Sequence, residues 1–260
     1  MSETDVQPSR PAATCVIFRR ADSAPDEILM LRRSKELEFA GGMVVFPGGR
    51  VDEADLALAE TLGAADREEA GARIAAIRET LEESGLAIGL TEQISADRAQ
   101  AARAMLDEIG ALEPVLAHFG LALDLDALVP FARWHPRHAH FRVYDTRFYL
   151  HDLGTGAVDV AVDETENTRL FWASAKEALA MIARGEIEAI FPTLRNLERL
   201  ALFDGFGGAR DQAEGIEIRE IRPAVETRED GKWLTIPDDQ GYPVTEQLLS
   251  TADRGGGKGK

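Results

Sequence analysis

The sequence predicts a single α/β domain in which short strands come first and helices lie between and after them. Runs of β-branched and aliphatic residues at 13–20 and 27–33 flank the turn-rich ADSAPD, which favours a hairpin. Apolar residues then return at helical spacing between Asp66 and Ser84. The chain contains no internal repeat and no clear interdomain linker. Strands and helices mixed in this way indicate one α/β domain with helical additions.

Bulk composition excludes several classes of protein. The 260 residues, 45% of them hydrophobic, are enough for one large domain or two small ones. No apolar run approaches the roughly 20 residues that span a membrane, and the polar N-terminus resembles no targeting signal. A lone cysteine, Cys15, excludes an internal disulfide and predicts a reducing, cytoplasmic location. The net charge of −17 argues against nucleic-acid or membrane partners, but a small anionic substrate could bind through a metal or a cation cluster.

The remaining elements follow the same signals along the chain. MVVFPGG predicts a third strand that Pro47 and two glycines end, and Gly85 is expected to be the left-handed cap of the helix at 66–84. Further elements are expected as helices at about 91–109 and 113–120, strands at 128–134, 141–150 and 169–172, helices at 174–184 and 193–203, and a hairpin that turns at 229–231. Polar, Gly- and Pro-rich compositions predict disordered tails at 1–12 and 251–260, which leaves one domain over 13–250 with a helical insertion at about 91–120.

The stretch RETLEESGL, at 78–86, concentrates carboxylates on the predicted helix. Glu79, Glu82 and Glu83 stand at i, i+3 and i+4, which places them on one face within a single turn. Like charges so close would destabilise an isolated helix, whereas a hard divalent cation among them would offset the repulsion. Arg78 can pair with Glu82 at i+4. Taken alone, the motif is more typical of a solvated acidic surface than of a metal site.

A glycine loop upstream makes the metal interpretation more specific. In VFPGGRVDEAD, two glycines after a strand let the backbone approach a ligand and free a carbonyl, such as that of Gly48, to bind a metal. Together with the acidic helix, this loop resembles the Nudix box, G-x5-E-x7-R-E-U-x-E-E-x-G-U, in which U is aliphatic. Gly49 matches its first glycine, and the second half is matched by Arg78, Glu79, Glu82, Glu83, Gly85 and Leu86.

The chain departs from this pattern at three points. Asp55 stands where the pattern has glutamate, and Thr80 stands at an aliphatic position. Between Asp55 and Arg78 lie 22 residues (56–77), where the pattern has seven. We interpret the excess as a longer loop and an earlier helix start, because insertions in surface loops cost little free energy. Such an interrupted box is similar to that of the Nudix branch resembling the mammalian peroxisomal coenzyme A diphosphatase. Similarity to that branch extends over about 13–203, through LMLRRSKELEFAGGMVVFPGG, ARWHP, YDTRFYL, FWASAKEAL and FPTLRNLERL.

The resemblance implies a fold, a cofactor and an activity. The fold would be a Nudix-type α/β/α sandwich with a mixed sheet. Glu79, Glu82 and Glu83 would hold Mg²⁺ or Mn²⁺ together with the Gly48 carbonyl, and Glu79 is the first choice for the base. The reaction would be hydrolysis of a nucleoside diphosphate linked to another group, with coenzyme A or acyl-coenzyme A as the first choice. ADP-ribose, NADH and other nucleotides remain alternatives, as does a non-catalytic nucleotide-binding module, although the complete RE-x-x-EE argues against the latter.

Other polar residues remain open as site candidates. Relatives often use a further glutamate from a later loop, and here Glu164 and Glu166 qualify equally, with Asp55 as another acid. Arg32 and Arg33 end a strand just before the glycine loop, where they could contact phosphate or only raise solubility. The histidines of RWHPRHAHFR match no zinc spacing and are expected near the cleft or on the surface. A homodimer is compatible with the resemblance.

Overall fold

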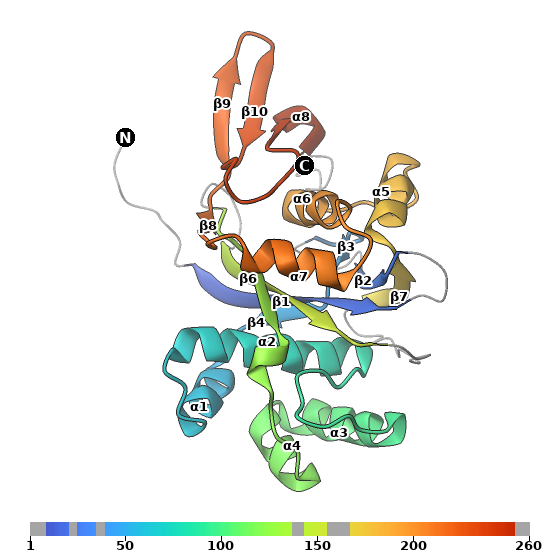
Figure 1. Cartoon of the computed structure of the whole chain (residues 1–260), viewed down its shortest axis with the longest axis vertical. Coiled ribbons are helices and arrows are strands. Elements are labelled where there is room, and N and C mark those ends of the chain that lie inside the picture. Colours follow the sequence, from blue (N-terminus) through green and yellow to red (C-terminus); the bar gives the residue numbers. More distant parts are fainter. Residues whose placement is uncertain (1–8, 21–24, 35–39, 137–142, 155–166, 253–260) are drawn as a thin grey trace.

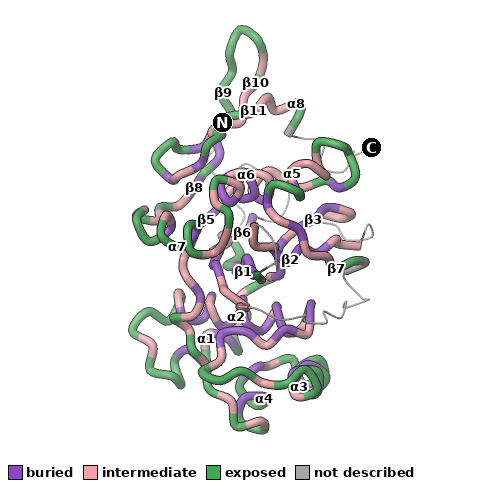
Figure 2. Tube along the Cα trace, turned by 45° about the vertical axis from the view of Figure 1, so that its right-hand side comes forward, coloured by how far each residue is buried: buried purple, intermediate pink, exposed green. Residues whose placement is uncertain are grey.

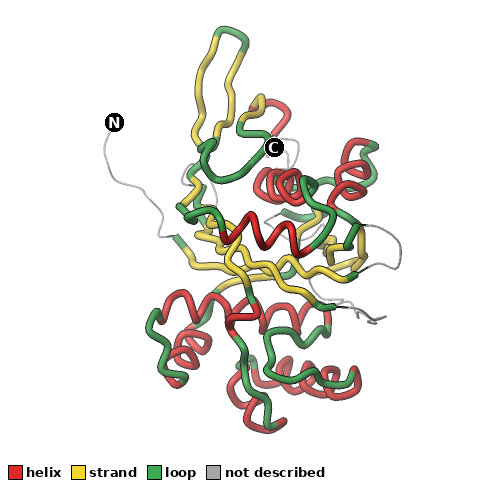
Figure 3. Tube along the Cα trace, viewed as in Figure 1, coloured by secondary structure: helices red, strands yellow, loops and turns green. Residues whose placement is uncertain are grey.

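A computed structural model describes residues 9–20, 25–34, 40–136, 143–154 and 167–252. Within these residues a mixed eight-stranded sheet is covered by helices on both faces, as Figures 1 and 3 show. The α/β class predicted from the sequence is therefore confirmed, and the three layers are those of an α/β/α sandwich. No helix in the described ranges is both long and apolar enough to cross a membrane.

The central sheet is built around β1, whose nine-residue parallel pairing with β6 is its longest ladder. Its path runs β3-β2-β1-β6-β5-β8, with β4 paired to β1 and β7 paired to β2. The strands are β1 (Arg10–Arg19), β2 (Glu27–Arg33), β3 (Val44–Val45), β4 (Gly48–Arg50), β5 (Val129–Trp134), β6 (Tyr144–Asp152), β7 (Asn167–Ala173) and β8 (Glu220–Ile221). A separate sheet contains β9 (Ala224–Arg228), β10 (Gly231–Thr235) and β11 (Glu246–Leu248). The expected hairpins β1–β2 and β9–β10 are both present.

Each face of the central sheet buries its own core, because side chains alternate along the strands. Cys15 and Ile17 of β1 pack toward the face that carries α2, whereas Val16 and Phe18 pack toward the opposite face. The first face is covered by α1 (Glu53–Thr61), α2 (Arg67–Ser84), α3 (Ala96–Ile109), α4 (Leu112–Phe119) and the short η1 (Leu125–Ala127). The other is covered by α5 (Ala175–Ala183), α6 (Phe191–Leu200) and α7 (Phe206–Glu214), and α8 (Leu249–Ala252) lies by the small sheet. In Figure 2 burial is concentrated in the sheet and α2, while the β9–β10 hairpin is largely exposed.

Helix α2 matches its prediction from the sequence at both ends. The side chain of Asp66 accepts a hydrogen bond from the Glu69 amide at 3.0 Å, which caps the first turn. Gly85 ends the helix with φ of 75°, a left-handed conformation that favours glycine. Its Ile74, Ile77 and Leu81 side chains are buried in the core that α2 shares with β1, α3 and α4. The helix therefore holds its polar face in a fixed position relative to β1 and β4.

The structure confirms the early helix start expected within the 56–77 segment but corrects the expected long loop. The segment is not a long loop: most of it is helical, because α1 occupies residues 53–61 and α2 begins at Arg67. Asp52 and Asp55 form a capping box at the start of α1. Gly71 of α2 allows Leu56 to approach closely, since a Cβ there would lie 2.6 Å from Leu56 Cδ2. The insertion is thus a packed helical hairpin on α2.

Several element boundaries also differ from the prediction. Strand β1 begins at Arg10, where it pairs with Tyr144, so residues 10–12 belong to the sheet and not to a tail. MVVFPGG splits into β3 and β4 because Pro47 interrupts the strand, and the helix expected from residue 91 starts at Ala96. Helix α7 was not expected from the sequence, and its first turn is capped by a distant residue: the Phe206 amide donates to Asp26 at 2.9 Å. Residues 1–8 and 253–260 lie outside the described residues.

Candidate active site

The polar end of α2 is organised by a buried ion pair between Arg78 and Asp55. Arg78 Nε donates to Asp55 Oδ1 at 3.0 Å, and Nη2 donates to Oδ2 at 3.1 Å. The two side chains are 5% and 1% exposed, so the pair is removed from water. Asp55 Oδ2 also accepts from the Asp52 amide at 2.9 Å, which closes the capping box of α1. Asp55 therefore joins the helical insertion to α2 across the 22 intervening residues.

The same guanidinium holds two of the predicted metal ligands. Arg78 Nη1 donates to Glu79 Oε1 at 3.1 Å and to Glu82 Oε2 at 2.8 Å. The Arg78–Glu82 pair is the i, i+4 contact expected from the sequence. Nη2 additionally donates to the Arg50 carbonyl at 2.9 Å, which ties α2 to β4. One arginine thus fixes the orientation of both carboxylates.

Glu83 and the glycine loop form the second contact between α2 and β4. The Gly48 amide donates to Glu83 Oε2 at 2.8 Å. Gly48 has φ of 155°, and a Cβ there would lie 2.4 Å from the Ala13 carbonyl oxygen, so only glycine fits beside β1. A Cβ on Gly49 would lie 2.2 Å from Glu79 Oε1. Gly48 is therefore required where the loop backbone lies against β1, whereas a side chain at Gly49 would displace the Glu79 carboxylate.

Burial makes these carboxylates costly to ionise. Burial raises the pKa of Glu82 to about 7, even though the Arg78 charge acts to lower it. Burial likewise raises the pKa of Glu79, again against the influence of Arg78. For Arg78, burial lowers the pKa, but the hydrogen bond that Arg78 donates to Asp55 and the charges of the surrounding carboxylates outweigh burial and leave the pKa raised. The positive charge of Arg78 therefore offsets only part of the free-energy cost of ionising the buried Glu79 and Glu82 carboxylates.

The carboxylates of α2 are suitable ligands for a hard divalent cation, although they are not arranged around one common point. Carboxylate oxygens are the ligands that Mg²⁺ prefers, and a cation would favour the ionised forms that burial disfavours. Within the described part of the chain, no three aspartate, glutamate, histidine or cysteine side chains form a ready-made metal site. Glu79 and Glu82 share Arg78 Nη1, while Glu83 contacts the Gly48 amide.

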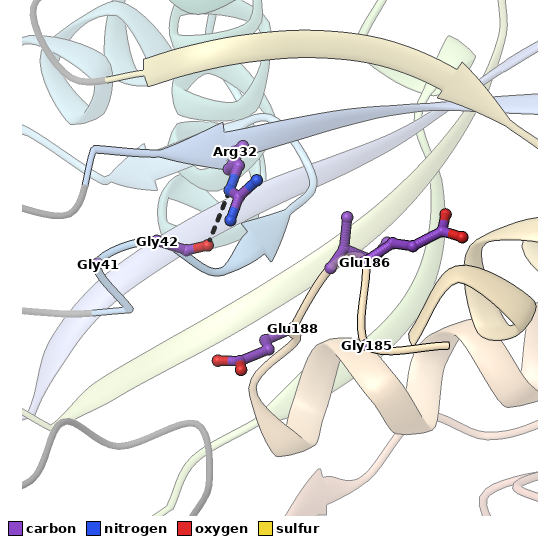
Figure 4. Close-up of a pocket in the computed structure, with 7 residues that line it drawn as sticks. Arg32, Gly41, Gly42, Gly185, Glu186 and Glu188 are labelled. Carbon is purple, nitrogen blue, oxygen red and sulfur yellow. Dashed lines mark hydrogen bonds between the residues drawn. The ribbon is translucent and has the colours of Figure 1, made fainter. Parts of the chain in front are cut away.

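The two arginines at the end of β2 occupy different settings. Arg32 pairs with Val44 in the sheet, and its Nε donates to the Gly42 carbonyl at 3.2 Å in the wall of a polar cavity (Figure 4). Arg33 follows at a register shift in the β2–β7 ladder, and its backbone holds the 40–43 turn through Met43 and Gly42. Arg32 therefore lines a cavity, whereas the backbone of Arg33 anchors a turn.

Other candidates from the sequence lie apart from this cluster. Glu164 and Glu166 lie outside the described residues, as do His138 and His140 of the histidine-rich run. His135 contacts the Glu220 carboxylate of β8 through Nδ1, so its ring is held at the edge of the sheet and lies apart from the cluster on α2. Sequence reasoning gave Asp55 only as an extra acid. The signal that could have identified its role was D-E-A-D after the glycine loop, a helix start with an acidic residue at the third helical position.

The chain is similar to Nudix proteins in both sequence and fold. A family model described as NUDIX domain matches residues 8–105, from β1 to α3. The chain is 27% identical over 277 residues to acyl-coenzyme A diphosphatase NUDT19 of Gallus gallus, an alignment that covers 84% of this chain and 73% of that protein. A crystal structure of a NUDIX hydrolase from Alicyclobacillus acidocaldarius superposes with a TM-score of 0.69 at 28% identity, over 80% of this chain and 97% of that one.

Proposed function

Because this chain is a Nudix hydrolase, we propose that it cleaves the diphosphate of a nucleoside diphosphate conjugate, with coenzyme A or an acyl-coenzyme A as substrate. The supporting observation for the reaction is the single assembly that joins the Gly48–Gly49 loop, Arg78 and the carboxylates of α2. Support for the substrate comes from the similarity to an acyl-coenzyme A diphosphatase over most of the chain. The small-molecule substrate agrees with the net charge of −17, which disfavours nucleic acid.

Each residue of the assembly has a distinct part in this proposal. Glu79, Glu82 and Glu83 would hold Mg²⁺ or Mn²⁺, with the Gly48 carbonyl as a further ligand. The metal supplies charge neutralisation and lowers the pKa of bound water. Glu79 serves as the base, since burial raises its pKa and so strengthens its carboxylate as a proton acceptor. Arg78 orients Glu79 and Glu82, and Asp55 holds Arg78 in place.

A substrate panel tests this proposal. Coenzyme A, an acyl-coenzyme A, ADP-ribose, NADH and a nucleoside triphosphate are incubated with the protein, with Mg²⁺ or with a chelator, and products are identified by mass. We expect cleavage of the coenzyme A diphosphate only when Mg²⁺ is present. Rapid cleavage of ADP-ribose or NADH without turnover of coenzyme A would assign a different substrate. The cytoplasmic location and the homodimer stay predictions, for which fractionation and sedimentation are the measurements.

A further inference from the structure

A short ladder of hydrogen bonds runs along the buried side of α2 at its C-terminal end. Thr80 Oγ1 donates to the Ala76 carbonyl at 2.7 Å, and Ser84 Oγ donates to the Thr80 carbonyl at 2.6 Å. Ser84 Oγ also accepts from the Leu86 amide at 3.2 Å, beyond the Gly85 cap. Both hydroxyl-bearing residues are fully buried. Ser84 therefore connects the chain that follows the helix to a carbonyl one turn earlier.

These hydroxyls lie on the side of α2 that faces the core. Thr80 and Ser84 follow Ile77 and Leu81 at helical spacing, and Thr80 stands where the Nudix box has an aliphatic residue. A hydroxyl that bonds to the carbonyl four residues earlier slightly destabilises a helix, and alanine has a higher helix propensity than serine. Helix propensity therefore does not account for Ser84. Its distinctive contact is the one to the Leu86 amide, which closes the end of the helix.

The last turn of α2 carries two of the predicted metal ligands in an unfavourable position. Glu82 and Glu83 stand at the negative end of the helix macrodipole. Every residue of α2 is described, and none in its last turn is basic. The last carbonyls of a helix have no partner within it, so this turn is the one that frays most readily. Arg78 and the Gly48 amide hold the two carboxylates. Ser84 holds the backbone from which these carboxylates project.

We propose that Ser84 is a positioning residue, whose hydroxyl keeps the last turn of α2 ordered in the metal-free protein so that a divalent cation meets a turn that is already formed. The proposal rests on the proposed function, because it assumes that Glu82 and Glu83 bind the metal. A ligand that must first order its site loses the free energy of that ordering. Removal of the hydroxyl therefore weakens metal binding without removing any metal ligand.

Ser84→Ala and its matched control Thr61→Ala test this role with Mn²⁺ alone, titrated by calorimetry. Thr61 ends α1, and its hydroxyl donates to the Ala57 carbonyl at 3.1 Å, which is the same type of bond at an exposed helix end. Ser84→Ala should raise the Kd for Mn²⁺ about tenfold, and the Mn²⁺ concentration for half-maximal turnover should rise by the same factor. Thr61→Ala should change neither value. An unchanged Kd in Ser84→Ala, or equal rises in the two variants, would overturn the proposal.

Hydrogen exchange of the chelator-treated protein separates this proposal from the proposed function. In Ser84→Ala the amides of residues 83–85 should exchange at least about tenfold faster than in the wild-type protein, because the last turn opens more often. Thr61→Ala should exchange there at the wild-type rate. Equal exchange in Ser84→Ala and the wild-type protein would refute the ordering role of the hydroxyl. A wild-type protein that binds no Mn²⁺ would refute the metal assignment, and the exchange rates would still decide whether Ser84 orders the turn.

Discussion

Replacing Asp55 by asparagine should destabilise the protein by about 3 kcal/mol. The change keeps the size of the side chain and one acceptor oxygen for the Asp52 amide, but it removes the charge opposite Arg78. Removing one partner of a buried ion pair typically costs about 3–5 kcal/mol, because the other charge stays buried. Arg78 retains Glu79 and Glu82, so the lower end of that range applies.

Urea unfolding of the metal-free protein measures this cost. The matched control is Asp52→Asn, whose side chain is 48% exposed and lies 3.7 Å from the guanidinium. A half-exposed pair at this distance contributes at most about 1 kcal/mol. Equal losses of stability in Asp55→Asn and Asp52→Asn would contradict a buried ion pair between Asp55 and Arg78 that stabilises the fold.

Three further perturbations have defined outcomes. Gly49→Ala should lower kcat at least about tenfold with an unchanged circular dichroism spectrum, because its Cβ would collide with Glu79. The pKa of Glu82 is raised to about 7 in the folded protein, so Glu82 stabilises the metal-free fold at acidic pH, and this stabilisation is lost as pH rises through 7. In the presence of chelator, the Tm of the wild-type protein should therefore fall over this pH range, and the Tm of Glu82→Gln should not show this fall. Tyr242→Phe removes a hydroxyl that accepts from Trp134 and donates to a buried asparagine, and urea unfolding should show a loss of about 1–3 kcal/mol; no loss would contradict the network.

Periodicity and caps predicted α2 well because its signals are local. The repeat of Ile74, Ile77 and Leu81 and the cap at Gly85 are read from neighbouring residues, and the structure uses them in the expected way. The β1–β2 hairpin and the α/β class were accessible for the same reason.

Contacts between distant segments could not be read from the sequence. Asp55 and Arg78 are brought together only by the packing of α1 on α2. The spacing between them in the sequence suggests a long loop instead. The first turn of α7 depends on Asp26, a residue from the β1–β2 connection. The three glutamates share a helix turn as predicted, yet Glu83 contacts the Gly48 amide while the other two contact Arg78. These arrangements depend on tertiary packing, so short-range patterns do not encode them.

The most direct test of the central claim is the hydrolysis of coenzyme A by the wild-type protein and by Glu83→Gln, each with Mg²⁺. A glutamine oxygen can still accept the hydrogen bond from Gly48, so the variant should keep its fold and its Tm. Loss of one carboxylate from the metal-binding set should lower kcat at least about 100-fold. A folded Glu83→Gln variant that cleaves coenzyme A at the wild-type rate would contradict the assignment of α2 as the catalytic helix.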